Sequence, residues 1–449
     1  MENLDGTILA TAAPSIARSF AVPSASISVA ITAYLLALAV FIPLSGWLTD
    51  RLGIRVVFIS AIAVFTLSSL ACAFSVGLTE FTVLRVVQGI GGAMMVPVGR
   101  LAVLRQTEKT DIIRAVAWLT WPALLAPIAA PFLGGVITTY GTWPWIFLLN
   151  VPLGVIGILA AIRLVPSSVR VRDRPLDWLG FSLVCVGLGL LAYAGSAFSE
   201  TSPPWVPGVS ALVLGLALTG LAALHLVRTA HPLFDIRMFR TETFRVPHGG
   251  GSLFRLTILA MPFMLALFFQ DALGWSPIRA GSVILVLFVG NLAIKLATTP
   301  LLTRYGFRRV LIASTAGAVV SMVLTALLDD STPLVWIIAL LFFSGVTRSV
   351  GFTAYNTIAF ADIDESQTTD ANTLASTVQQ VAAGFGVAVG AIALRAGAPL
   401  ASLVGLPGIL GAFQVAFVLI AILCAIALAE VILLSRRAGD NIRPVRAPG

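Results

Sequence analysis

The sequence predicts an all-α integral membrane protein with fourteen transmembrane helices. Of its 449 residues, 58% are hydrophobic and only 11% are charged, whereas an ordinary soluble domain has roughly 25% charged residues. The apolar residues gather in runs of about 20, which is the length that crosses a bilayer as a helix. No run alternates with the period of two that a membrane β-strand would show.

Fourteen apolar runs follow one another along the chain, and each is expected to be one helix. They cover residues 3–20, 27–49, 55–77, 80–104, 113–138, 142–165, 177–199, 205–228, 247–271, 278–302, 308–329, 334–360, 370–398 and 408–435.

The basic residues predict the orientation of these helices. Lys and Arg concentrate in every second connection, for example Arg170, Arg172 and Arg174, and again after the last run at Arg436 and Arg437. Cytoplasmic loops carry this excess, so we expect a multi-pass protein of the plasma membrane, the bacterial inner membrane, with both termini cytoplasmic. The net charge of +8 is scattered among apolar runs and forms no continuous basic stripe, so the expected partner is the lipid bilayer and not nucleic acid.

An internal repeat indicates two similar halves. The stretch WLTDRLGIRVVF at 47–58 is echoed by PLLTRYGFRRVL at 300–311, each following the second helix of a set of six. We therefore expect three parts. They are an N-terminal six-helix bundle at 1–165, two inserted linker helices with cytoplasmic loops at 166–245, and a C-terminal six-helix bundle with a short cytoplasmic tail at 246–449.

Six charged residues inside the expected spans are candidates for function, because intramembrane charges are costly. They are Asp5, Arg85, Arg100, Arg255, Lys295 and Arg348. Arg100 and Arg255 could instead extend along the lipid to the membrane surface. Burial would disfavour the ionised form of Asp5, and a nearby Arg85 would favour it, so Asp5 is the candidate proton-coupling acid.

Other chemistries have no support in the sequence. Neither of the two lysines follows a glycine, so a GKS/T phosphate loop is absent. The cysteines have no paired spacing, and the three histidines, read as solvated loop residues, have no metal-binding spacing. We expect neither an enzyme nor a bound metal or cofactor.

Four motifs in combination resemble those of the major facilitator superfamily, in its 14-helix drug:proton antiporter branch with the MdtD-type multidrug transporters. They are LDGTILATAAP at 4–14, GWLTDRLGIR at 46–55, LRVVQGIGGAMMVPVGR at 84–100 and WPWIFLLNVPLG at 143–154. A fifth motif of that branch, on helix 5, is less faithful, because APIAAPFLGG at 126–135 has Ala126 and Ala130 where glycine is usual.

The resemblance implies the superfamily fold, two six-helix bundles plus two inserted helices, and roles for four groups of residues. Proton coupling falls to Asp5 and Arg85, the conformational switch to Gly46, Asp50, Arg51, Gly53 and Arg55, the helix 4 motif to Gln88 and Gly89, and the helix 5 motif to Pro131, Gly134 and Gly135.

Polar residues of the C-terminal half are the candidates for a substrate cavity. They are Arg255, Asn291, Lys295, Arg348 and Tyr355. Asn291 and Lys295 are expected on one helix face, and Arg348 and Tyr355 on another. Since the expected spans hold five cations and, in this interpretation, Asp5 as their one acid, the predicted substrate is an organic anion and not a lipophilic cation.

The predicted function is secondary active transport, namely efflux of small organic compounds or drugs in exchange for protons. The transporter would act as a monomer by alternating access. Two alternatives stay open at this point. One is a proton-coupled importer or organic-anion exchanger on the same fold, and the other is a non-transporting membrane sensor.

The first helix is expected to be incomplete in this chain. Its apolar part after Asp5 runs from Gly6 to Ala17, about 18 Å at 1.5 Å per residue, whereas the hydrocarbon core is about 30 Å thick. We therefore expect the natural protein to begin upstream of Met1.

Overall fold

The computed structural model describes most of the chain as helix. The described residues are 1–106, 126, 129–165, 176–199, 204–229, 232–233, 235–363, 368–406, 408–435 and 438–439. Within these ranges no β-strand occurs, and the predicted all-α class is confirmed.

The chain forms two compact units, each described by itself. Unit 1 comprises Met1–Leu233 with Ser276–Gly281, and unit 2 comprises Phe234–Trp275 with Ser282–Gly449. The boundary between Leu233 and Phe234 places both inserted helices in unit 1.

The helices of unit 1 follow the expected runs. They are α1 (Glu2–Phe20), η1 (Ser24–Ile27), α2 (Ser28–Leu52), α3 (Ile54–Ala73), α4 (Leu78–Gln106), α6 (Pro144–Leu148), α7 (Asn150–Leu164), α8 (Trp178–Ser199) and α9 (Trp205–Arg228). Residue 126 and residues 129–140 are also helical, and they include all described residues of the expected fifth span.

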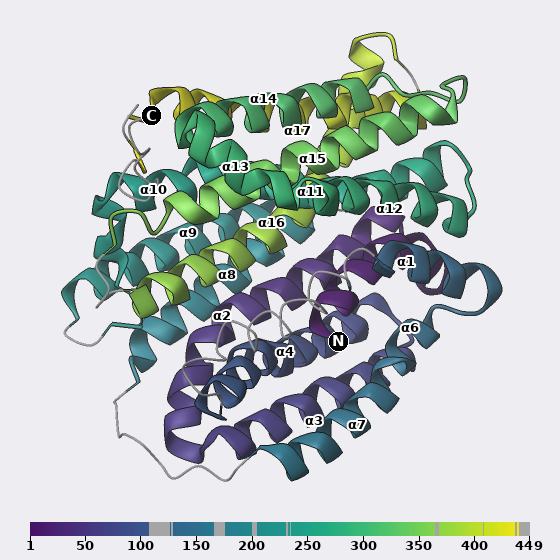
Figure 1. Ribbon diagram of the computed structural model, residues 1–449. Helices are drawn as coiled ribbons and strands as arrows, with labels where there is room; N and C mark the ends of the chain where they lie inside the picture. The colour runs from purple at the N-terminus through teal and green to yellow at the C-terminus, as the bar shows by residue number, and fades with distance from the viewer. Residues whose placement is uncertain are drawn as a thin grey trace. The chain divides into compact units, whose positions relative to one another are not determined.

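The remaining helices belong wholly or mainly to unit 2. They are η2 (Ile236–Arg240), α10 (Glu242–His248), α11 (Gly250–Leu267), the π-helix η3 (Phe268–Ala272), α12 (Pro277–Ala293), α13 (Lys295–Tyr305), α14 (Phe307–Thr325), α15 (Leu334–Ile358), α16 (Thr368–Leu403) and α17 (Ile409–Leu433). In Figure 1, α14 and α17 lie side by side, as do α3 and α7 of unit 1.

The structure is consistent with fourteen spans. Among the described residues, 11 helices are long and apolar enough to cross a membrane, and the bent pair α12 and α13 raises this to 12. Helix α1 and the helical residues 129–140 coincide with the first and fifth expected runs, so every predicted run corresponds to helix over most of its described residues.

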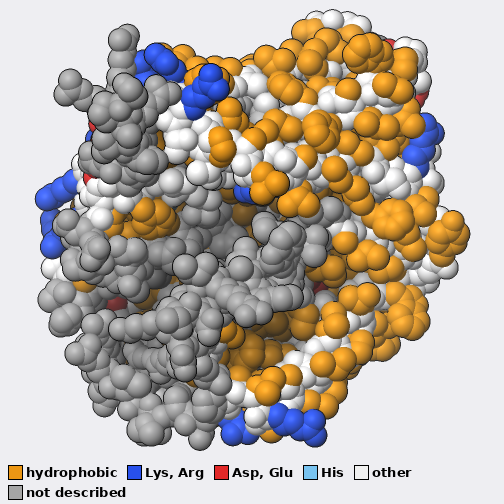
Figure 2. Space-filling view, in the orientation of Figure 1, with side chains coloured by type: hydrophobic (Ala, Val, Ile, Leu, Met, Phe, Trp, Pro, Cys, Tyr) orange, Lys and Arg blue, Asp and Glu red, His pale blue; other side chains and the backbone are white. Residues whose placement is uncertain are grey.

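The outer surface is apolar, as a bilayer requires. Figure 2 shows hydrophobic side chains over most of the described surface in that view, with basic side chains in a few groups. Leu67, Val213 and Leu296 are 66%, 58% and 91% exposed. A soluble monomer seldom exposes so many large apolar side chains together, whereas lipid chains solvate them.

The internal repeat recurs in three dimensions at the turns between α2 and α3 and between α13 and α14. Gly53 has φ 84° and ψ 151°, and Gly306 has φ 80° and ψ 159°. Both angles fall in a region that is essentially restricted to glycine. Each glycine N–H bonds a carbonyl four residues earlier, Thr49 and Leu302, at 3.0 Å. The glycine therefore ends one helix and begins the next.

An arginine two residues after each glycine connects its turn to another helix of the same unit, α7 in unit 1 and α17 in unit 2. Arg55 Nη2 donates to the carbonyl oxygen of Ile162 on α7 at 2.5 Å. Arg308 Nη2 donates in the same way to Ile432 on α17 at 2.6 Å. Because these carbonyls lie in final helical turns, where no intrahelical donor reaches them, the arginines act as C-terminal caps.

The inserted helices pack on each other and on α2. Gly187 of α8 lies so close to α9 that a Cβ would come within 2.7 Å of Thr219 Oγ1. The rings of Phe41 on α2 and Phe181 on α8 meet edge to face at 5.4 Å, and a Trp47–Trp178 pair adds a second such contact at 5.7 Å. Close apolar packing therefore holds α8 and α9 against α2 within unit 1.

One expected helix is broken. The tenth run bends by 48° between α12 and α13, so the prediction that Asn291 and Lys295 share a face of one continuous helix was wrong. Asn291 lies near the end of α12, and Lys295 begins α13. Helical spacing alone does not reveal a bend of this kind.

We expect Gly53→Ala and Gly306→Ala each to destabilise the protein by about 1–3 kcal/mol, because a Cβ is strained at these angles. The apparent unfolding temperature of the purified protein in one detergent measures the effect.

The matched control is Gly189→Ala. Gly189 lies inside α8, and a Cβ added there would meet no neighbouring atom within 4 Å, so alanine should be neutral or slightly stabilising. Equal unfolding temperatures for all three variants would contradict the role given to the two turn glycines.

Candidate functional site

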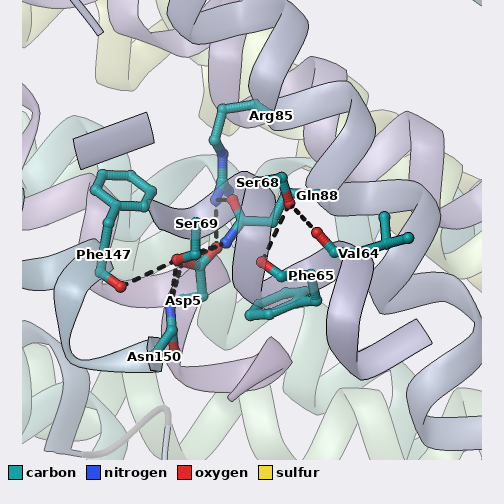
Figure 3. Close-up of polar contacts among 9 residues, drawn as sticks. All are labelled: Asp5, Val64, Phe65, Ser68, Ser69, Arg85, Gln88, Phe147 and Asn150. Atoms are coloured by element: carbon teal, nitrogen blue, oxygen red, sulfur yellow. Dashed lines mark hydrogen bonds and ion pairs between the residues drawn. The ribbon is translucent and has the colours of Figure 1, made fainter. Parts of the chain in front are cut away.

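A buried ion pair joins α1 to α4 in unit 1. Arg85 Nη1 donates to Asp5 Oδ2, and the two side chains are 0% and 1% exposed. Figure 3 shows the pair at the centre of a polar cluster that reaches α3 and α7. The structure thus brings together the two residues that the sequence assigned to proton coupling.

Two side-chain amides complete the environment of the carboxylate. Gln88 Nε2 and Asn150 Nδ2 each donate to Asp5 Oδ1 at 3.2 Å. Both amides also donate to Ser69 Oγ, at 3.2 and 3.0 Å, and Ser69 Oγ donates to the carbonyl of Phe147 at 3.1 Å. Among the described residues, every group that hydrogen-bonds the Asp5 carboxylate is a donor, an arrangement that suits an ionised carboxylate.

The guanidinium of Arg85 is held from the other side by an amide and by aromatic rings. Its Nη1 also donates to Gln88 Oε1 at 2.6 Å. Its Cζ lies 3.9 Å from the ring centroid of Tyr34 and 5.8 Å from that of Phe147. Cation–π contacts of this kind partly replace the hydration that a buried cation loses.

Glycines let the helices that carry the cluster approach closely. A Cβ on Gly89 would come within 2.6 Å of the Tyr34 carbonyl oxygen on α2, and one on Gly134 within 3.0 Å of the Ile8 carbonyl oxygen on α1. Gly89 and Gly134 therefore have a packing role that brings α2, α4 and the helix at 129–140 around Asp5.

The residues assigned to a conformational switch lie at the α2–α3 turn. Gly46 and Arg51 are exposed, with Arg51 Cζ 4.9 Å from the Trp47 ring centroid. Gly53 and Arg55 make the turn and the cap described above. The Asp50 side chain lies outside the described residues, as does that of Arg100.

The basic candidates of unit 2 lie on three helices. Arg255 of α11 is fully buried, so the alternative that it extends to the membrane surface was wrong. Arg348 of α15 is 8% exposed, and Lys295 of α13 is partly buried. Tyr355 is 0% exposed and packs on Phe254 with ring centroids 5.2 Å apart, so it lines the core and not an open surface.

Three sequence interpretations need correction. Glu430 of α17 also lies inside an expected span and is partly buried, so Asp5 is not the one acid there. Its carboxylate lies against the backbone at Gly249 and Gly250. His248 is buried and stacks on Phe244 at 4.2 Å, and His225 Nε2 lies 2.8 Å from Asp177 Oδ1, so neither is a solvated loop residue.

The sequence reasoning missed Asn150, Ser69 and Tyr34. Asn150 stands alone among apolar residues in IFLLNVPLG, and a lone amide in an apolar run could have been recognised as a buried hydrogen-bonding residue. Ser69 and Tyr34 have no comparable signal, because serine and tyrosine are common in membrane helices.

No metal or cofactor site emerges from the part of the chain that the structure describes. No group of three or more His, Cys, Asp or Glu residues lies together there. Cys72, Cys185 and Cys424 are free thiols.

Known proteins of similar sequence identify the family of this chain. A family profile described as the Major Facilitator Superfamily matches residues 1–234 and 249–448. Proteins named "Putative multidrug resistance protein MdtD" from Escherichia fergusonii and from Escherichia coli strain SE11 are each 36% identical over 400 residues, which cover 88% of this chain and 83% of the relative.

Solved structures share the fold at low identity. The nucleoside transporter NupG is 13% identical, covers 96% of both chains and has a TM-score of 0.66. The D-xylose–proton symporter is 12% identical, covers 94% of both chains and has a TM-score of 0.62. At these identities the similarity concerns the fold alone.

We expect Arg85→Gln to lower the stability of the protein by about 3–5 kcal/mol, because it leaves the Asp5 carboxylate buried without its counter-ion. The double variant Asp5→Asn/Arg85→Gln should recover part of that loss, since it removes both charges. Thermal unfolding of the three proteins in the same detergent provides the comparison.

Arg163→Gln serves as the control, since Arg163 is exposed near the end of α7 and surface substitutions usually change stability by under about 0.5 kcal/mol. A double variant less stable than Arg85→Gln would argue against a stabilising pair.

Proposed function

Because the chain belongs to the major facilitator superfamily, we propose that it is a proton-coupled antiporter, acting as a monomer, that exports small organic compounds by alternating access. The chain is a multi-pass membrane transporter of this family and not an enzyme. The observation that carries the proposal is the buried Asp5–Arg85 pair, in which one titratable acid is held by donors from two other helices.

Proton coupling follows from two states of this pair. With the pair closed, the carboxylate is ionised and stabilised by Arg85 and both amides. When helix movement separates Arg85 from Asp5, an ionised carboxylate would be left in an apolar interior at a cost of several kcal/mol. Uptake of a proton removes that cost, so the protonation of Asp5 and the position of α1 against α4 become linked.

Gln88 and Asn150 donate to Asp5 from different helices, so helix movements differ in which donors they withdraw from the carboxylate. Asn150 begins α7, whereas Gln88 lies on α4 with Arg85. A movement of α7 therefore withdraws one donor from Asp5, and a movement of α4 withdraws a donor and the counter-ion together. The proposed coupling step is the movement of α4 relative to α1, because, unlike a movement of α7, it removes the positive charge from Asp5.

The hairpin at Gly53 supplies the proposed switch. Gly46, Asp50 and Arg51 lie at the end of α2, and Arg55 ties α3 to α7. A rigid turn of this kind transmits a rocking motion of α2 to α3 and α7. The alternating halves in this proposal are residues 1–165 and 246–449, and residues 166–245 form an insert.

Export is the proposed direction because the curated relatives carry a multidrug resistance name. In a bacterial inner membrane the gradient of protons is directed inward, so exchange against protons moves a compound outward. Both termini are proposed to face the cytoplasm, in accordance with the basic loops.

Asp5→Asn should abolish transport driven by a pH gradient while it leaves substrate exchange at equal pH intact, because the amide cannot release a proton. Everted membrane vesicles with an acidic lumen test this, with uptake of labelled 2-naphthalenesulfonate and, in parallel, of tetraphenylphosphonium. Uptake should fall to the level of vesicles that lack the protein.

Glu80→Gln is the matched control, since Glu80 is an exposed acid of α4 whose carboxylate accepts from the Val76 N–H. It should transport as the unchanged protein does. Gradient-driven uptake that survives in Asp5→Asn would remove Asp5 from the coupling mechanism.

Labelling from outside the cell tests the orientation. In a variant whose three cysteines are replaced by serine, Ser331→Cys in the exposed turn between α14 and α15 should react with an impermeant maleimide on intact cells. Ser435→Cys, after α17, should react only after the membrane is opened. The reverse pattern would place the termini outside.

A further inference from the structure

The two units differ in the counter-ions of their buried cations. In unit 1 the guanidinium of Arg85 is neutralised by Asp5. In unit 2, among the described residues, Arg255, Arg348 and Lys295 have no carboxylate within the 4.0 Å of an ion pair, and their hydrogen bonds are to neutral groups. Three cations without counter-ions in a membrane interior are costly unless a ligand compensates them.

Arg348 is the least satisfied of the three. Its one hydrogen bond in the described structure runs from Nη1 to the carbonyl oxygen of Ile258 at the long distance of 3.4 Å. Its Cζ lies 5.5 Å from the ring centroid of Phe288. A guanidinium has five N–H donors, so most of the donors of this buried group are available to a ligand.

Arg255 is better fixed but keeps its charge. Nη1 donates to the Pro247 carbonyl at 2.8 Å, and Nη2 donates to Asn356 Oδ1 at 2.5 Å. Its Nε has no hydrogen-bond partner although it is buried. Phe352 lies with its ring centroid 5.8 Å from Arg255 Cζ.

One stretch of α15 carries or contacts all three cations. Arg348 belongs to it, Arg255 bonds Asn356, and Lys295 Nζ donates to Thr353 Oγ1 at 3.1 Å. Residues 348 to 356 span about 12 Å of helix at 1.5 Å per residue. Phe352, Thr353 and Asn356 are partly buried and not sealed in the core, so this stretch of the helix is accessible.

Glu430 does not cancel these charges. Its carboxylate lies against Gly249 and Gly250 at the start of α11, where a helix N-terminus favours an anion. Among the described residues, no ion pair joins it to Arg255. The positive charge facing Phe352 is therefore not balanced within the described part of unit 2.

We propose that Arg348, Arg255 and Lys295 bind the anionic head of an organic substrate, a carboxylate or sulfonate on an apolar or aromatic body. The inference rests on the proposed transport function and names its substrate class. Arg348 supplies a bidentate contact to the head, Lys295 adds a compact charge, and the Phe352 and Phe288 rings contact the body. A lipophilic cation would be repelled from the same place.

Equilibrium binding tests the substrate class without any pH gradient. The full-length protein in lipid nanodiscs is titrated with 2-naphthalenesulfonate, which stays ionised, and with tetraphenylphosphonium as an aromatic cation. We expect saturable binding of the sulfonate that competes with aromatic carboxylates, and no competition from the cation.

Three variants locate the site. Arg348→Gln should weaken sulfonate binding by about tenfold or more, because a charge-assisted hydrogen bond is lost. Arg348→Lys should lie between Arg348→Gln and the unchanged protein, since it keeps the charge but not the planar donor pair. Lys295→Gln should weaken binding less than Arg348→Gln.

Arg309→Gln removes one positive charge from an exposed position of α14, and this variant should bind the sulfonate as the unchanged protein does. Size-exclusion profiles and unfolding temperatures show that each variant is folded. If Arg348→Gln misfolds, the milder Arg348→Lys and Lys295→Gln variants still test whether these cations bind the sulfonate.

The outcomes separate this inference from the proposed function. Sulfonate binding that depends on Arg348 supports the anion site even if Asp5→Asn leaves transport unaffected, which would overturn only the coupling proposal. Tight binding of tetraphenylphosphonium, or sulfonate binding unchanged in all three variants, would overturn the anion site even where transport is proton-coupled.

Discussion

An ion inside a membrane protein must find a counter-ion or several donors, because the apolar interior cannot solvate it. Asp5 and Arg85 meet this requirement by pairing across two helices, and Gln88 and Asn150 both donate to the other carboxylate oxygen. One carboxylate therefore links α1 to α4 and α7 directly, and to α3 through the amides that also bond Ser69. Any rearrangement of these helices has to provide for the same charge in another way.

The two units share their hairpins but not their interiors. The turn glycines and capping arginines at 53 and 55 recur at 306 and 308 with nearly the same backbone angles and the same kind of carbonyl acceptor. The balanced pair of unit 1 has no equivalent in the described part of unit 2, where the arginines contact carbonyls, an amide and aromatic rings. The scaffold is thus repeated while its polar contents have diverged, which is what separate tasks for the two halves would require.

Much of the fold could be predicted because hydropathy and turn residues are local properties. Run lengths located the helices, and GxR after a helix located the repeated turns. Asp5, Arg85 and Gln88 could be identified because charged and amide side chains are rare in apolar runs. Ser69 could not, since its role depends on partners 19 and 81 residues away. The break between α12 and α13 and the burial of Arg255 likewise depend on tertiary packing.

The inserted helices α8 and α9 have a consequence for the lipid around the protein. Phe181 and Trp178 of α8 are packed edge to face against rings of α2. Helices α8 and α9 therefore have to move together with α2. In the proposed alternating-access cycle, a wider cross-section then moves through the acyl chains at every turnover. Viscous drag of the membrane would thus oppose this motion more than the motion of a transporter without the inserted pair, and acyl-chain order would help to set the transport rate.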